Sequence, residues 1–191
     1  EVVPALRMDA RIGPYAYVIP GLGISGGHLE RDLATVLSLA SEMGTDAGPI
    51  DVIDADCRRR QDYVLKTIHA QLDVEGSRPN IAIWGLAYKP GTESTKNSPA
   101  LNLIDSIRDF PVKIYDPQAA LNRKEFPNVT RAKSCLDACQ GSDALAVMTP
   151  WAEFAEIDLS AVRESMAGRV IIDPFGALDQ GECSDLGFLY F

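Results

Sequence analysis

The chain has 191 residues, a length that suits one good-sized domain or one domain with an appendage. Hydrophobic residues make up 46% and charged residues 24%, a globular composition that excludes low-complexity disorder. Acidic residues outnumber basic ones by 27 to 18, which gives a net charge of −9. We therefore expect neither nucleic acid nor a membrane as the main partner, because both favour a positive surface.

Four cysteines, at positions 57, 135, 139 and 183, lack the spacing of metal ligands, and the chain has only two histidines. We therefore expect no metal site. Reduced thiols are typical of the cytosol, which predicts a cytoplasmic protein. No apolar run approaches the ~20 residues of a membrane span.

Residues 1–28 are expected to form a short helical segment and then a loop rich in proline and glycine. The loop reads Ile19-Pro20-Gly21-Leu22-Gly23-Ile24-Ser25-Gly26-Gly27. So many turn-forming residues prevent regular structure and let the backbone approach a ligand closely.

Residues 29–76 are predicted to form two helices. Apolar residues recur along the first at the spacing of one helix face, and Gly44 ends it. The second is expected to begin at Pro49 and to run about six turns, to residue 72. An apolar stripe of this length needs a partner surface, which predicts a homodimer through the 48–76 helix.

Residues 78–191 alternate between strand and helix patterns. Strands are expected at 81–85, 112–116, 144–148, 170–172 and 188–190, and helices at 98–107 and 134–140, with a helix or turns at 151–166. This alternation predicts an α/β fold with a Rossmann-like, doubly wound parallel sheet. The predicted division is a loop and helical dimerisation or linker region at 1–77 and the sheet domain at 78–191.

In such sheets ligands bind beyond the carboxyl ends of the strands. Gly85-Leu86-Ala87 is not a full glycine fingerprint. Lys89 could bind a phosphate or carboxylate, or it could be a solvated loop lysine. Asp116 could accept a hydrogen bond from a ribose hydroxyl, or it could form the turn before Pro117. His28 follows two glycines at a helix start, where it could donate to an anion or act as a base.

Several motifs follow one another along the chain: Met8 to Pro14, Pro20 to Gly27 with Asp32, the long helix, Gly85 to Thr92 with Ser98-Pro99-Ala100, Ile114 to Pro117, and Thr149-Pro150-Trp151 with Phe154. In this order they resemble the second half of the UDP-glucose/GDP-mannose dehydrogenase family.

The resemblance implies an NAD-dependent, two-step oxidation of a nucleotide sugar, UDP- or GDP-linked, at its C6 alcohol. It implies that NAD is bound mainly by an N-terminal domain absent from this chain. In the family a cysteine of the glycine-rich loop forms a thioester, and the following aspartate, here Asp32, assists hydrolysis.

The resemblance also assigns binding residues. Arg11 matches an arginine that reaches the neighbouring subunit's sugar site, and Tyr88-Lys89 match an aromatic–lysine pair at the substrate. Arg31 and Lys96 fall at positions expected to contact the cofactor. The loop around the sugar and phosphates would use Tyr17, Pro20, Gly21, Gly23, Gly26 and Gly27.

The chain departs from the family at several site positions. The nucleophilic cysteine is replaced by His28 or Leu29, depending on where a one-residue gap is placed, and neither forms a thioester as a thiolate does. The family's Thr-Arg-Glu-Ser run reads Thr95-Lys96-Asn97-Ser98, and its Asp-Gly-Arg strand end reads Asp173-Pro174-Phe175. Three hypotheses follow: a dehydrogenase portion with His28 and Asp32 at the reacting position, a non-catalytic nucleotide-sugar-binding or assembly subunit, or an unrelated Rossmann-like module.

Overall fold

The computed structural model describes residues 2–16, 18, 21–72, 76–121 and 125–191. The predictions at Tyr17 and Pro20 therefore lie outside the described residues. Among the described helices, none is long and apolar enough to cross a membrane.

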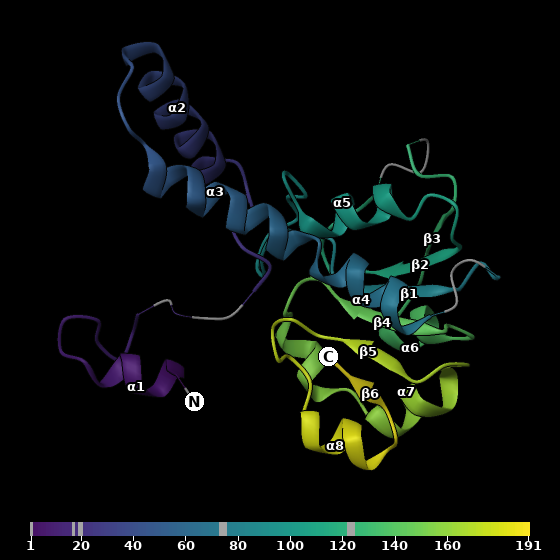
Figure 1. The fold of residues 1–191 in the computed structure, drawn as a ribbon. Helices are drawn as coiled ribbons and strands as arrows, with labels where there is room; N and C mark the ends of the chain where they lie inside the picture. The colour runs from purple at the N-terminus through teal and green to yellow at the C-terminus, as the bar shows by residue number, and fades with distance from the viewer. Residues whose placement is uncertain (1, 17, 19–20, 73–75, 122–124) are drawn as a thin grey trace.

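The first part of the chain is helical, as predicted. Helix α1 spans Val2–Met8, α2 His28–Met43, α3 Gly48–Gln61 and α4 Tyr63–Gln71. Gly44 ends α2 in the left-handed conformation, with φ of 62°. Figure 1 shows α2 and α3 as a hairpin that projects from the sheet, while α1 lies apart from the rest of the molecule.

One continuous helix over 48–76 was predicted, and this is wrong. The chain leaves regular helix at Asp62, between α3 and α4. The two parts also differ in burial: α3, all of whose residues are described, buries no side chain, whereas α4 buries Val64 and Ile68. The break lets α4 turn its apolar face to the sheet, a requirement of packing that helix periodicity does not reveal.

The remainder forms a six-stranded parallel sheet, which confirms the predicted fold class. Its strands are β1 Ile81–Trp84, β2 Val112–Tyr115, β3 Val129–Arg131, β4 Ala144–Val147, β5 Val170–Ile172 and β6 Leu189–Tyr190, in the order β3-β2-β1-β4-β5-β6. This is the order of the doubly wound dinucleotide-binding fold. In register, β1 runs from Ile81 opposite Val112 to Trp84 opposite Tyr115.

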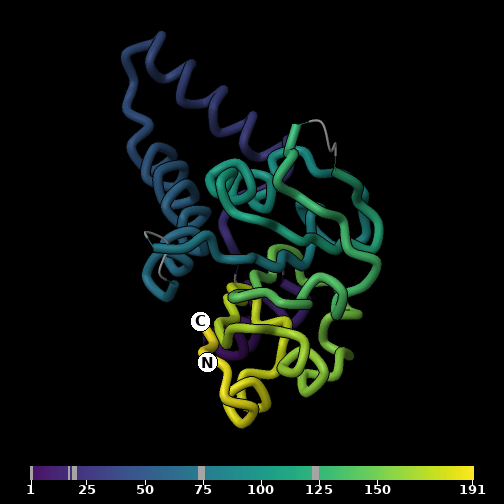
Figure 2. The backbone as a smooth tube through the Cα atoms, turned by 90° about the vertical axis from the view of Figure 1, so that its right-hand side faces the viewer, coloured from purple at the N-terminus to yellow at the C-terminus, as the bar shows by residue number. Residues whose placement is uncertain are grey.

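Helices pack on both faces of this sheet. The later helical elements are α5 Pro99–Ser106, α6 Cys135–Cys139, the 3₁₀ helix η1 Ala152–Glu156, α7 Leu159–Ser165 and α8 Gln180–Asp185. Helix α4 lies against α5 and β5, and α6 lies against β1, β2 and α7. Every residue of β1, β4 and β5 is buried, as expected for central parallel strands. Figure 2 shows the sheet domain as one body with the α2–α3 hairpin beside it.

Two elements, β3 and α8, were not predicted from the sequence. Strand β3 is a three-residue edge strand with one buried side chain, too short for a clear pattern. Helix α8 did have a signal, since Asp179 caps it by accepting a hydrogen bond from Glu182 N, in a capping-box-like Asp-x-x-Glu spacing.

Candidate functional site

The loops after β1, β2, β4 and β5 meet at the carboxyl edge of the sheet, where a ligand is expected. Asp116 lies at the centre of this edge and is only 2% exposed. One carboxylate oxygen accepts hydrogen bonds from Leu86 N at 2.6 Å, Ala87 N at 3.0 Å and Trp151 Nε1 at 3.2 Å. The other accepts from Gln118 N at 2.8 Å and Ala119 N at 2.6 Å.

Asp116 therefore joins three loops and has no oxygen left over for a ribose hydroxyl. Of the two interpretations of this residue, the structure supports the turn former. The backbone N–H groups of Leu86 and Ala87, which would otherwise be available to a phosphate, are occupied by the protein's own carboxylate. Gly85, with φ of +96°, lies so close to Thr149 that an added Cβ would be 2.5 Å from its side chain. The turn after β1 thus does not fit the pyrophosphate of a dinucleotide.

Residues 21–27 of the glycine-rich loop cross this edge, and Gly23 lies on α3. A Cβ at Gly23 would meet the backbone of Cys57 at 3.1 Å, so glycine is needed for this close approach. Gln61 Nε2 donates to Ile24 O at 3.1 Å, and Asn102 Nδ2 donates to Gln61 Oε1 at 3.3 Å. Gln61 thereby links the loop to both α3 and α5.

The next three residues of the loop lie on the segment after β1. Ser25 Oγ donates to Tyr88 O at 3.1 Å. Gly26, with φ of +78°, faces the Tyr88 ring, where a Cβ would come within 2.8 Å of Cε2. Gly27 faces the aliphatic end of Lys96, where a Cβ would come within 2.7 Å of Cε. The structure thus brings two predicted loop glycines against two predicted residues that are more than 60 positions away in sequence.

Two predicted cations border this contact. Lys89 is exposed, and its Nζ lies 5.6 Å from the centre of the Tyr88 ring, within cation–π range. Lys96 is also exposed, beside Gly27. A mobile ammonium group at the rim of a glycine-rich backbone is suited to an anionic ligand.

The two predicted catalytic residues, His28 and Asp32, come after this loop in the chain, on α2. His28 is the first residue of α2 and is exposed to solvent. Asp32 lies one turn later, and its carboxylate is 3.4 Å from Arg31 Nη2, with both side chains more than 60% exposed. His28 and Asp32 share one end of α2, but no described hydrogen bond joins them.

Arg11 is not brought to this site. It belongs to the segment after α1, which Figure 1 shows apart from the sheet. Its side chain is 89% exposed. Its guanidinium donates to both oxygens of Asp9, at 3.0 and 2.6 Å. These hydrogen bonds lower the pKa of Asp9 and raise the pKa of Arg11.

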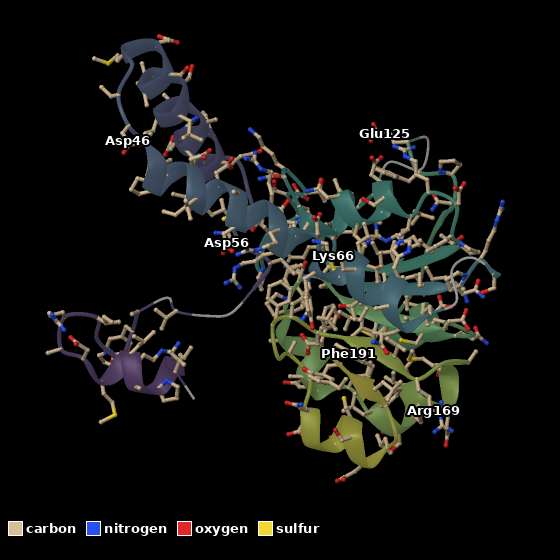
Figure 3. All side chains as sticks on the ribbon, in the orientation of Figure 1. Asp46, Asp56, Lys66, Glu125, Arg169 and Phe191 are labelled. Carbon is tan, nitrogen blue, oxygen red and sulfur yellow. The ribbon has the colours of Figure 1, made fainter. Side chains whose placement is uncertain are left out.

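Gly21 lies at the other end of the loop, against the ring of Phe175, whose Cε1 would be 3.1 Å from an added Cβ. A pocket of about 540 Å³ opens beside it, between the loop, α3 and the ends of β5 and β6. Arg59 and Arg60 line the pocket and both pair with Asp56. These hydrogen bonds lower the pKa of Asp56. Figure 3 labels two residues that line this pocket, Asp56 on α3 and Phe191 after β6.

Three of the four thiols lie in the core. Burial raises the pKa of Cys135 to about 12 and that of Cys183 to about 11, and it also raises the pKa of Cys139. Such thiols are poor nucleophiles at neutral pH. Cys57 is half-buried, and of the four it is the one that lies against the glycine-rich loop. Among the described residues, no three His, Cys, Asp or Glu side chains are grouped so as to hold a metal ion.

The sequence analysis gave no role to Gln61, Asn97 or Cys57. Gln61 and Cys57 lie on a helix that the sequence predicted only as an apolar stripe. Asn97 did carry a signal, because it stands in the departure from the family's Thr-Arg-Glu-Ser run. Its φ is +49°, and among the described non-glycine residues it alone has a positive φ.

The model of the UDP-glucose/GDP-mannose dehydrogenase family, UDP binding domain, matches residues 82–180, just over half of the chain. The chain belongs to this family. The matched region runs from β1 to the start of α8 and includes Tyr88, Lys89, Lys96 and Asp116. This agrees with the resemblance found in the sequence.

Curated relatives extend the likeness beyond the matched domain. The chain is 35% identical over 182 residues to the UDP-glucose 6-dehydrogenase AglM of Haloferax volcanii, covering 91% of this chain and 40% of AglM. It is 26% identical to the UDP-glucose 6-dehydrogenase of Pseudomonas aeruginosa, covering 100% of this chain and 44% of that protein. The chain therefore spans less than half the length of these relatives.

Solved structures share the fold. The UDP-D-ManNAc dehydrogenase of Pyrococcus horikoshii superimposes with a TM-score of 0.74 at 24% identity, over 99% of this chain and 42% of that one. The NDP-N-acetyl-D-galactosaminuronic acid dehydrogenase of Methanosarcina mazei gives 0.79 at 17% identity, over 100% and 42%.

Proposed function

We propose that this chain is the nucleotide-sugar-binding portion of a dehydrogenase of this family. One observation supports the proposal above others: the glycine-rich loop is fixed on the segment after β1, with Lys89 and Lys96 at its rim. Local cations can hold a diphosphate even though the net charge is −9. The Gly26 N–H is bound to Asn97 O, so the loop donors we propose for the diphosphate are those of Gly23 and Gly27.

Calorimetric titration of the chain with UDP-glucose and with GDP-mannose tests this proposal. We expect saturable binding of one of them, and expect it to weaken at least tenfold in Lys89→Ala. Arg169→Ala, at an exposed cation directly before β5 and hence at the opposite edge of the sheet, serves as the control and should leave binding unchanged. Absence of saturable binding of both ligands refutes the proposal.

For the whole protein we propose NAD-dependent oxidation of the sugar's C6 alcohol. The turn after β1 does not fit a dinucleotide, which supports a cofactor site outside this sheet. Arg31 and Lys96 would then contact the cofactor only from the edge of that site. His28 and Asp32, one turn apart on α2, are the proposed proton-handling residues. With His28 or Leu29 at the cysteine position, we expect the reaction to stop at the aldehyde. Formation of two NADH per sugar would show that a second oxidation does proceed.

A second candidate, a non-catalytic binding or assembly subunit, is favoured by a separate observation. The loop itself has no thiol, and three of the four cysteines are buried with raised pKa values. Reduction of NAD by the whole protein with any nucleotide sugar would eliminate this candidate.

We also propose a homodimer, now through the α2–α3 hairpin rather than the whole 48–76 segment. Helix α4 packs against the sheet and buries part of its surface there. Helices α2 and α3, all of whose residues are described, bury no side chain. The hairpin leaves large apolar side chains in solvent, among them Val36 at 45% and Met43 at 74% exposure. A second copy would cover this surface. The four unpaired cysteines fit the proposed cytoplasmic location.

A further inference from the structure

Asn97 makes two reciprocal contacts with the backbone of Gly26, 71 positions earlier in the chain. Its Nδ2 donates to Gly26 O at 3.1 Å, and its backbone O accepts from Gly26 N at 3.4 Å. Both polar groups of the Gly26 backbone are therefore bound by one residue. Gly26 is buried, so these groups have few alternative partners.

The conformation of Asn97 is the unusual feature that permits both contacts. Its φ of +49° is a left-handed conformation, which asparagine tolerates better than most residues. The preceding segment is fixed by hydrogen bonds from Tyr88 N to Ser94 O and from Ser98 N to Thr95 O, each at 3.1 Å. Ser98 then caps α5, so Asn97 is held from both sides.

The contact fixes the end of the loop that leads into α2. Gly26 is followed by Gly27, which lies against Lys96, and by His28, the first residue of α2. Asn97 is only half-buried and lies outside the core, and its side chain makes no other described hydrogen bond. Its interactions are thus directed at the loop and not at the sheet.

We propose that Asn97 is a positioning residue that fixes the backbone at Gly26. Gly27 and the start of α2 are thereby held beside Tyr88 and Lys96, where the nucleotide sugar binds. The inference rests on the proposed function for the identity of the ligand. The fixing of the loop itself can be measured without any ligand. Asn97 is not a catalytic residue, since it acts on the ligand through Gly26.

Asn97→Gly is the informative variant. Glycine adopts a positive φ without strain and keeps the backbone carbonyl, so the substitution removes the side-chain donor and leaves the fold intact. A neutral hydrogen bond is worth about fivefold in an equilibrium constant. We expect UDP-glucose or GDP-mannose, whichever the wild type binds, to bind about fivefold more weakly, with an unfolding temperature that falls no further than that of Asn128→Ala, which loses a comparable hydrogen bond.

Asn97→Asp and Asn128→Ala complete the comparison. The carboxylate introduced by Asn97→Asp would set an oxygen against Gly26 O, so we expect weaker binding than in Asn97→Gly. Asn128 Nδ2 donates to Phe110 O at 2.9 Å, far from the loop. We therefore expect Asn128→Ala to lower the unfolding temperature and to leave affinity unchanged. A purely structural role for Asn97 predicts that Asn97→Gly, like Asn128→Ala, lowers the unfolding temperature with no loss of affinity, and that result overturns the proposal.

Amide exchange separates this inference from the proposed function. Without ligand, we expect the Gly26 amide to exchange about fivefold faster in Asn97→Gly than in the wild type. Equal exchange in the two proteins refutes the positioning role, whatever the affinities are. If the wild type binds neither sugar, the proposed function fails, and the role of Asn97 in ligand binding fails with it. Faster exchange of the Gly26 amide in Asn97→Gly would still establish that Asn97 holds the loop.

Discussion

Replacement of Asp116 by asparagine tests whether this carboxylate organises the carboxyl edge of the sheet. Its two oxygens accept five hydrogen bonds, two on one oxygen and three on the other. An asparagine side chain has one oxygen and one NH₂ group. Either orientation of the amide therefore sets a donor against at least two N–H groups, and at least one of these is buried.

The expected loss of stability follows from these unmade bonds. Each buried donor left without a partner costs about 1–3 kcal/mol, so Asp116→Asn should lower the free energy of unfolding by at least about 1–3 kcal/mol. This is a large part of the roughly 5–15 kcal/mol typical of a folded domain. We also expect weaker nucleotide-sugar binding, because the loop after β1 would lose two of its anchors.

Urea unfolding followed by circular dichroism measures the change, and Trp151, which donates to Asp116, provides a local fluorescence signal. Asp158→Asn is a matched control. Asp158 caps α7 by accepting from Ser160 N and Ala161 N, and asparagine caps about as well, within about 0.5 kcal/mol. A loss below about 1 kcal/mol in Asp116→Asn would refute the reasoning.

Three further predictions concern the loop, the thiols and the hairpin. Gly26→Ala should reduce nucleotide-sugar affinity at least tenfold in titration calorimetry because its Cβ would clash with Tyr88, whereas Gly141→Ala, with a similar φ of +72° and no neighbour within 4 Å, should not. Burial raises the pKa of Cys183 from 9.0 to about 11, so the stability that its protonated thiol contributes is full below pH 9 and should be lost between pH 9 and 11. Urea unfolding at several pH values would show this as a fall in the free energy of unfolding. If Cys183→Ala shows the same fall with pH over this range, the prediction is contradicted. Val36→Glu should shift the mass measured by light scattering toward a monomer, and an unaltered mass would count against the hairpin as the dimer contact.

Local patterns were enough to predict most elements of the sheet domain, with β3 and α8 as the exceptions. Apolar runs such as Ile81–Trp84 and Val170–Ile172 became buried strands, and Ser98-Pro99 began α5 as expected from capping. Those signals lie within a few residues of each other, so they can be found along the linear sequence. The break at Asp62 was not found, because it depends on which side chains the sheet covers.

The sequence analysis also placed the glycine-rich loop and Tyr88-Lys89 in one site, through the family resemblance. It could not choose between the two roles of Asp116, because a ribose acceptor and a turn former occupy the same position at a strand end. The five donors around Asp116 come from three separate loops, and their convergence is visible only once the strands are ordered.

The sequence by itself thus determined the family, the α/β class and the residues that could contact an anionic ligand. Tertiary structure decided which of these meet: Gly26 and Gly27 lie on Tyr88 and Lys96, while Arg11 lies apart from them. It also brought Asn97 to the loop, although 71 residues separate it from Gly26. The reason is physical. Helix and strand periodicity act over a few residues, whereas a binding site depends on contacts between distant segments that only the packing of the sheet and its loops can fix.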